Sequence, residues 1–229
     1  MASKQSGESD DAVAWGLESH KEARWPALIA TGTAIALQLI LPDNLIRGLG
    51  NRALLPALEG ALIVVLLVVS PGRISKEESR LRIVGVALIA LITVANVVSL
   101  TDLLHALLYS SKAGGRDLVY ASVPIWLTNV IAFGLWYWEL DRGGPAKRQT
   151  ARHRRPDFLF PQMSTPGCDK DWTPNFFDYL YTSFTNATAF SPTDTMPLTD
   201  WAKLLMMLQS LASLITVAVV VSRAVNILG

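Results

Sequence analysis

The chain has 229 residues, of which 51% are hydrophobic and 17% charged, with a mean hydropathy of +0.33. Soluble globular proteins average about 25% charged residues, so this balance predicts an integral membrane protein whose partner is the lipid bilayer. Twenty Lys and Arg against nineteen Asp and Glu leave a net charge of +1, which provides no basic field for nucleic acid. One cysteine, Cys168, excludes an internal disulfide and a multi-thiolate metal site within one chain.

Five segments are long and apolar enough to be transmembrane helices. A bilayer core about 30 Å thick requires roughly 20 mostly apolar residues, and a lone segment must be helical because unpaired amides are costly in hydrocarbon. In chain order the predicted spans are 25–41, 53–69, 83–101, 118–138 and 204–222. The expected fold class is therefore all-α, a polytopic transmembrane helical bundle with five spans.

A sixth segment, 174–190, is shorter and less apolar. Thr173 can cap it, Pro174 suits the first helical position, and Pro192 disfavours helix at the residue before it. The resulting helix is about 25 Å long, so it either crosses the membrane or enters and returns. An apolar face contains Phe177, Leu180, Tyr181 and Phe184, and a polar face contains Asp178, Thr182, Thr185 and Asn186, which predicts contact with protein or water as well as lipid.

Composition divides the chain into four regions. Residues 1–24 hold five acidic and three basic residues without an apolar run, which predicts a disordered polar tail. A four-helix transmembrane region, 25–140, follows, and then a basic linker rich in Gly and Pro, 141–171. The last region, 172–229, is expected to form a hydrophobic helical hairpin that resembles a pore segment.

The basic residues are unequally divided between the two sides of the predicted bundle. Fourteen Lys and Arg lie on the side of the amino terminus and of the 141–171 linker, and four lie on the other side. The positive-inside rule therefore orients the amino terminus and the linker toward the cytoplasm. We expect 174–190 to cross as a sixth span, which puts 191–200 outside. The linker either only sets this topology, next to anionic lipid, or docks an acidic partner.

Three ionisable residues lie within or at the ends of predicted spans. Glu59 stands two turns into the second span, beside Gly60, which permits close approach of another helix. It is either a proton-carrying carboxyl of a transporter or a carboxyl hydrogen-bonded to a neighbouring helix. Asp102 and His105 are three residues apart on one face, so the carboxylate can orient the imidazole, in a functional or only an interfacial pair.

A polar stripe follows the last predicted span. Gln209, Ser213, Thr216 and Arg223 recur at spacings of four, three and seven residues, which puts them on one face of a helix. This face either lines a pore or forms a polar seam between packed helices. The chain contains no nucleophile elbow, phosphate-binding glycine loop or His–Glu metal motif, so we expect neither enzymatic activity nor a cofactor.

The segment 177–226 resembles the pore helix, filter and inner helix of the tetrameric potassium channels. The similarity is in the order of Asp178, Tyr181, Ser183, Phe184, Thr188, Asp194, Pro197, Leu198 and Thr199, followed by a hydrophobic helix. Five residues without glycine separate Thr188 from Asp194, whereas the channel motif has four residues that include two glycines. Because glycine permits the backbone of a carbonyl-lined filter, potassium selectivity is not expected here.

The whole chain also resembles an uncharacterised family of bacterial polytopic integral membrane proteins. The similarity lies in the Tyr-Leu-Tyr, Ser-Phe-Thr and Thr-Asp-Thr patterns, which here occupy 179–181, 183–185 and 193–195. This resemblance implies a multi-pass protein of the bacterial cytoplasmic membrane and no particular activity.

Together these features predict a channel-like permeation protein without a potassium-selective filter. Its mouth is expected at Thr188, Ser191, Thr193 and Asp194, with the Gln209 stripe along the path and several copies around an axis, as a homo-oligomer. Two alternatives stay open. One is a structural or partner-binding membrane protein, and the other is a proton-coupled transporter that uses Glu59.

Overall fold

The computed structural model describes residues 22–41, 54–69, 77–109, 115–148, 155–165, 172–188 and 194–228, and these are mostly helical. The helices are α1 (Trp25–Ile40), α2 (Leu54–Val69), α3 (Glu77–Tyr109), α4 (Gly115–Leu140), α5 (Pro145–Arg148), α6 (Phe176–Thr188) and α7 (Asp200–Leu228). Two 3₁₀ turns, Asp141–Gly143 and Pro161–Met163, and two short strands, β1 (Phe158–Leu159) and β2 (Met196–Pro197), complete the chain order. The prediction of a helical fold is confirmed, and each predicted span coincides with one helix.

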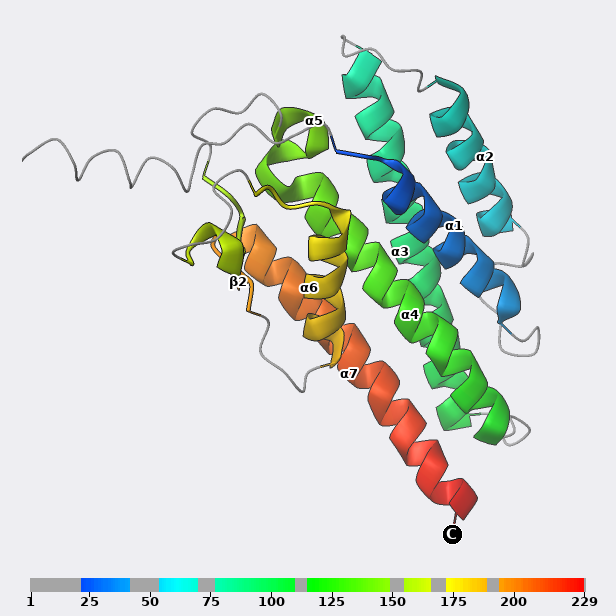
Figure 1. Ribbon diagram of the computed structural model, residues 1–229. Coiled ribbons are helices and arrows are strands. Elements are labelled where there is room, and N and C mark those ends of the chain that lie inside the picture. The colour runs from blue at the N-terminus through cyan, green and yellow to red at the C-terminus, as the bar shows by residue number, and fades with distance from the viewer. Residues whose placement is uncertain are drawn as a thin grey trace, which may run out of the picture.

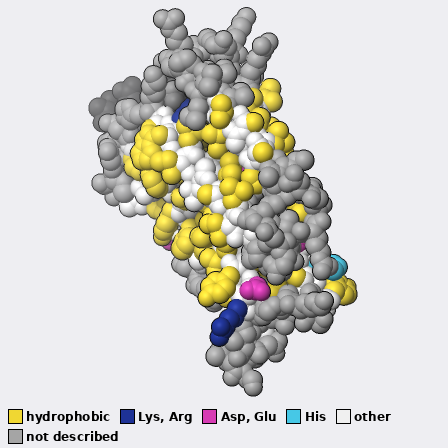
Figure 2. Space-filling view, turned by 90° about the vertical axis from the view of Figure 1, so that its right-hand side faces the viewer, with side chains coloured by type: hydrophobic (Ala, Val, Ile, Leu, Met, Phe, Trp, Pro, Cys, Tyr) yellow, Lys and Arg dark blue, Asp and Glu magenta, His cyan; other side chains and the backbone are white. Residues whose placement is uncertain are grey.

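Three of the described helices are long and apolar enough to cross a membrane. They comprise Arg82–Tyr109, Arg116–Gly143 and Asp200–Ser222, while α1 is apolar but shorter. The exposed side chains of these helices include many large hydrophobic ones, such as Val97, Leu108 and Leu214. Figure 2 shows hydrophobic side chains over much of the described middle of one face, with the visible charged side chains mainly toward its lower end. Such a surface is typical of helices that face lipid.

The central helix of the bundle is α4. Within an apolar stretch of 18 residues, 67% of α4 is buried, compared with 33% of α3 and 28% of α7. It packs against α1, α3, α6 and α7, and α2 lies on the outside against α1 and α3 (Figure 1). The main core gathers around Ile92, Leu135 and Tyr137, all fully or almost fully buried. A helix in contact with four others explains why the long uncharged stretch 118–138 has no polar face.

After α6, the described chain is again found at the end of the bundle where α6 begins. Beyond α6, β2 pairs antiparallel with β1, with Phe158 opposite Pro197 and Leu159 opposite Met196. The helices α6 and α7 then run in the same direction, since Ser183 bonds to Gln209 and, further on, Ala187 to Ser213 (Figure 1).

The expectation that 174–190 crosses the bundle is therefore wrong. A helix of 13 residues is only about 20 Å long, too short for a bilayer core. The residues 194–199 consequently lie near the linker end, not at the opposite end of the bundle.

The amino-terminal boundary of α6 also differs from the prediction. The cap is Asn175, whose Oδ1 accepts a hydrogen bond from the Phe177 amide at 2.9 Å, while Asp178 Oδ2 accepts one from the Asn175 amide at 2.8 Å. This reciprocal pair satisfies two amides that the first turn leaves unpaired. It starts the helix two residues later than Thr173 and Pro174 suggested.

Close approach of α4 and α6 depends on Gly134. A Cβ placed there would lie 3.2 Å from the Leu180 Cα and 3.6 Å from the Ser183 Cβ. We expect Gly134→Val to push α6 away and to lower the free energy of unfolding by about 1–3 kcal/mol, the range for overpacking. Thermal unfolding in detergent measures the change. Gly85→Val is the matched control, because nothing lies within 4 Å of a Cβ at Gly85 in α3, and equal losses would contradict the packing argument.

Candidate functional site

The candidate site is the α6–β2 hairpin, which we define as residues 176–199, together with the face of α7 beside it. Residues 189–193 lie outside the described part of the chain. Backbone that is not helical is tolerated at membrane depth only where protein or water surrounds it. The contacts of this hairpin therefore show which of its parts are surrounded by protein and which are left for water.

The side-chain amide of Gln209 joins three helices. Its Nε2 donates to the Ser183 carbonyl at 2.8 Å and to the Ser183 hydroxyl at 2.6 Å. Its Oε1 accepts from the Tyr137 hydroxyl at 2.5 Å and from Asn186 Nδ2 at 2.8 Å. The Ser183 hydroxyl in turn donates to the Val130 carbonyl of α4 at 2.6 Å. Four hydrogen bonds thus satisfy all the polar hydrogens and lone pairs of this fully buried amide.

One turn further along α7, Ser213 also joins α4, α6 and α7. Its hydroxyl donates to the Ala187 carbonyl near the end of α6 and accepts from the Trp126 indole at 2.8 Å. The Ser210 hydroxyl donates to Asn186 Oδ1 at 3.1 Å. We name this set of contacts between α4, α6 and α7 the polar seam. It binds one end of the half-helix α6 to two long helices.

The Gln209 stripe predicted from sequence is therefore an internal seam in the part that the structure describes. Gln209, Ser213 and Thr216 are all buried within one chain. Thr216 donates to the Ala212 carbonyl of its own helix at 2.8 Å, and the side chain of Arg223 lies outside the description. Of the two interpretations of the stripe, the packing seam agrees with these contacts.

The predicted mouth residues are only partly described. Thr188 is half-buried and donates to the Thr185 carbonyl at 2.8 Å, and Asp194 is exposed. Ser191 and Thr193 lie outside the described residues. The returning limb is held by Thr195, whose hydroxyl lies 3.1 Å from that of Thr182.

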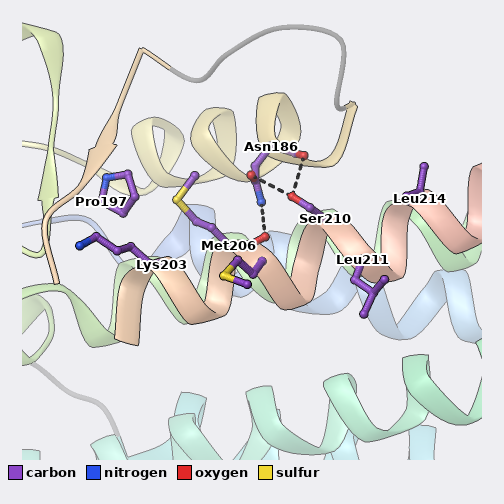
Figure 3. Close-up of a pocket in the computed structure, with 8 residues that line it drawn as sticks. Asn186, Pro197, Lys203, Met206, Ser210, Leu211 and Leu214 are labelled. Carbon is purple, nitrogen blue, oxygen red and sulfur yellow. Dashed lines mark hydrogen bonds between the residues drawn. The ribbon is translucent and has the colours of Figure 1, made fainter. Parts of the chain in front are cut away.

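A groove of about 580 Å³ runs along the exposed side of α7, where α6 and β2 diverge (Figure 3). Lys203 lies at one end, a polar step of Asn186 and Ser210 lies in the middle, and Leu214 lies at the other end. The remaining lining residues are Pro197, Met206, Met207 and Leu211. This face of α7 adjoins the polar seam, with which it shares Ser210 and Asn186, and sequence periodicity alone gives no reason to select it.

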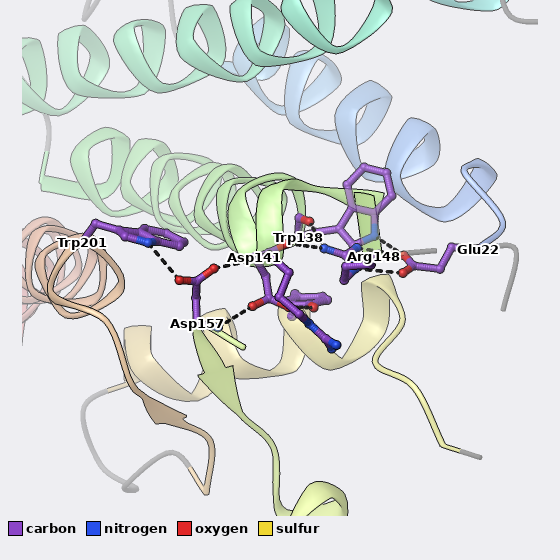
Figure 4. A network of polar contacts seen from close by, with 8 residues as sticks. Glu22, Trp138, Asp141, Arg148, Asp157 and Trp201 are labelled. Atoms are coloured by element: carbon purple, nitrogen blue, oxygen red, sulfur yellow. Dashed lines mark hydrogen bonds and ion pairs between the residues drawn. The ribbon is translucent and has the colours of Figure 1, made fainter. Parts of the chain in front are cut away.

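The linker end of the hairpin is held by a buried arginine, Arg148 (Figure 4). Its Nε and Nη2 donate to the two carboxylate oxygens of Glu22, each at 3.0 Å, and Nη1 donates to the Trp138 carbonyl at 2.6 Å. The guanidinium lies 5.1 Å from the centre of the Tyr179 ring in α6. Burial works against the charge, but interactions with Tyr179, Glu22 and Asp141 raise the pKa of Arg148 above the usual arginine value, so it stays protonated.

A second buried carboxylate, Asp141, continues this network. Its Oδ2 accepts from the Tyr179 hydroxyl at 2.6 Å, and its Oδ1 accepts from the Asp157 amide at 2.8 Å. Asp157 in turn accepts from the Arg142 amide at 2.7 Å and from the Trp201 indole at 3.1 Å. The ends of α4, α6 and α7 and the segment before β1 are thereby joined at one place.

The sequence pattern marks Arg148 and its neighbours only as part of a basic linker, and it gives no reason to select Tyr137, Trp126 or Glu22. The sequence does contain one sign that Arg148 is buried, because it follows the two glycines Gly143 and Gly144. Both glycines have positive φ, and a Cβ at Gly144 would lie 2.8 Å from the Glu139 carbonyl. A turn this tight folds the chain back onto the end of α4, which brings the next basic residues to buried carbonyls.

The three ionisable candidates do not meet in one site. Glu59 is fully buried in α2 and accepts a hydrogen bond from Gln38 Nε2 of α1 at 3.4 Å. His105 is exposed, and its ring lies 4.9 Å from that of Tyr109, while Asp102 is half-buried on the same helix. The pairing of Asp102 with His105 stays a prediction. Among the described residues, no group of three His, Cys, Asp or Glu side chains could hold a metal ion.

The polar seam predicts a measurable loss of stability in a Gln209 variant. Gln209→Leu leaves the Tyr137 hydroxyl and the Ser183 carbonyl buried without this partner, which should cost about 1–3 kcal/mol of unfolding free energy. Thermal unfolding in detergent reports the cost. The exposed Ser222, on the same helix, supplies the control Ser222→Ala, for which we expect almost no change.

The arginine network predicts a larger effect. Arg148→Gln strands the Glu22 carboxylate in a buried position, and breaking one partner of a buried ion pair typically costs about 3–5 kcal/mol. The exposed Arg155 provides the control Arg155→Gln, which removes an equal charge from the same segment. If both variants melt together with the unaltered protein, Arg148 does not hold the linker end.

No protein-family model, curated protein or solved structure matches this chain. Its function is therefore inferred from its own residues and contacts.

Proposed function

We propose that this chain is a multi-pass protein of the bacterial cytoplasmic membrane with five spans, α1, α2, α3, α4 and α7. The α6–β2 hairpin would enter the membrane and return on one side. Three long apolar helices support membrane insertion, and α1 and α2 need only a few flanking residues or a locally thin bilayer. The contact of Gln38, late in α1, with Glu59, early in α2, agrees with an antiparallel pair of spans.

The charge distribution supports the cytoplasm as the side of the hairpin. With a returning hairpin, fifteen of the twenty Lys and Arg fall in segments at the linker end and five at the other end. This bias is as strong as the bias in a six-span arrangement. The amino-terminal tail and the 141–171 segment would thus be cytoplasmic, and the carboxyl terminus would be outside.

Permeation is the function that the hairpin supports best, and the position of Asp194 carries this proposal. Asp194 is exposed, and the adjacent Thr195 lies beside Thr182. Thr182 is six residues into α6, which is roughly 9 Å along the helix axis from Phe176. A carboxylate at such a depth is too costly to face hydrocarbon, so it needs water or another protein surface. Several copies around an axis would enclose water at this face.

The groove on α7 supplies a continuation of such a path. It leads from Lys203, past the polar step of Ser210 and Asn186, to Leu214. Gln209 and Ser213, the buried α7 residues of the polar seam, lie on the neighbouring face, and their side chains are already hydrogen-bonded within the chain. We therefore propose that Asp194 and the groove residues line the path, and that the Gln209 stripe supports it from behind.

A structural or partner-binding role is the second candidate. It is favoured by two exposed hydrophobic residues that line the groove, Met207 and Leu211, which another membrane helix could cover. Under this alternative the purified protein still forms oligomers in detergent, but it moves no solute.

Asp194→Asn tests the permeation proposal directly. In liposomes that contain the purified protein, we expect cation flux to fall, because a ring of carboxylates at a mouth concentrates cations. The matched control is Asp117→Asn, which removes an exposed carboxylate at the other end of the bundle. Folded, reconstituted protein that gives no flux at all would remove permeation and leave the structural role.

A bulky substitution tests the groove separately. Leu214→Trp should fill its apolar end and reduce flux toward background without loss of folded protein. Leu208→Trp is the comparison, because Leu208 is also exposed on α7 but does not line the groove. Equal flux from the two variants, measured at equal amounts of reconstituted protein, would place the path elsewhere.

A further inference from the structure

The carboxyl group of Glu59 is buried with one oxygen unpaired. Its residue is 0% exposed, and its Oε1 accepts one hydrogen bond, from Gln38 Nε2 at 3.4 Å. Its Oε2 has no hydrogen-bond partner among the described residues. Unsatisfied buried polar atoms are rare in folded proteins, so each of them needs a physical explanation.

Within the described part of the chain, no ionisable residue lies near the middle of the helices that pack against α2. These helices are α1 and α3. The described α1 contains no ionisable residue, and Glu59 is the only one in α2. The ionisable residues of α3 are confined to its two ends. One group is Glu77, Glu78, Arg80 and Arg82, and the other is Asp102 and His105. Arg82 is already paired with Glu139 at 3.1 Å.

An ionised carboxylate in these surroundings would be buried without a counter-charge, which is far more costly than a neutral acid. A protonated Glu59 removes this cost. Because Gln38 donates to Oε1, the hydroxyl belongs on Oε2, and there it finds no acceptor in the described structure. The unpaired oxygen is thus the atom from which a proton can leave when the helices separate.

We propose that Glu59 and Gln38 form a proton-binding site between α1 and α2 that is occupied at neutral pH and exchanges its proton. Release of the proton leaves a carboxylate that only water can stabilise, so release is coupled to opening of the α1–α2 pair. The ligand is a proton, and proton occupancy controls how closely α1 and α2 pack. This site depends on the burial of Glu59 and not on permeation along the hairpin.

Infrared difference spectra of the purified protein in lipid, at pH 7, test this proposal. The spectrum of the unaltered protein minus that of Glu59→Gln should contain the C=O stretching band of a protonated carboxylic acid. The matched control is Glu139→Gln, since Glu139 is also buried but is paired with Arg82, and its difference spectrum should contain carboxylate bands. Gln38→Leu should keep the acid band and shift it, because Oε1 loses its donor.

Carboxylate bands for Glu59 at pH 7 would overturn the proposal. A second measurement needs no variant and so does not depend on the folding of Glu59→Gln. A hydrophobic carbodiimide adds to a protonated carboxyl without a leaving group and, after rearrangement, leaves a stable N-acylurea of the summed mass. At pH 7, where an ordinary Glu is protonated to well under about 1%, we expect at least about ten-fold more label on Glu59 than on Glu139. An absence of label on Glu59 would contradict an exchanging site, and neither result depends on solute flux.

Discussion

The position of the half-helix α6 depends on the buried amide of Gln209. Helices in a membrane gain little from hydrophobic burial against one another, so polar contacts and close packing decide which surfaces meet. Gln209 satisfies its whole hydrogen-bonding capacity with Ser183, Tyr137 and Asn186, from two other helices. Gly134 complements it, because the missing side chain lets α6 approach α4 closely. Without these contacts, a helix too short to cross a bilayer has no defined place in the bundle.

A different kind of interaction holds the other end of the hairpin. Arg148 is fully buried and gives a bidentate pair to Glu22, which is 126 residues away in the chain. Carbonyl groups at the end of α4 take its remaining donor group, so the charge is compensated in the way that buried guanidinium groups require. The polar seam and this network together hold α6 at both ends, and among the described residues that follow α6, Asp194 is exposed.

The two carboxylates that stand out in the described structure differ in their surroundings and so in the chemistry that they can perform. Asp194 is exposed on the returning limb, where its charge can attract cations. Glu59 is buried between helices with the Gln38 amide as its hydrogen-bond partner, and such surroundings favour a neutral acid over a carboxylate. A permeation path and a proton-binding site can therefore coexist in one bundle, since they lie on different helices and depend on opposite degrees of hydration.

Hydropathy and length were sufficient to determine the helical class, the place of each long helix that the structure describes and the polar and apolar faces of 174–190, because these are properties of consecutive residues. The stripe of Gln209, Ser213 and Thr216 could be identified as one face of a helix, but periodicity does not say which helix that face meets. The length of α6 permitted both crossing and return, and only the pairing of β2 with β1 decided for return. Arg148 looked like one more solvated linker charge, since its partner Glu22 is remote in sequence. Tertiary structure alone decided these points, because each depends on which distant segments fill the same space.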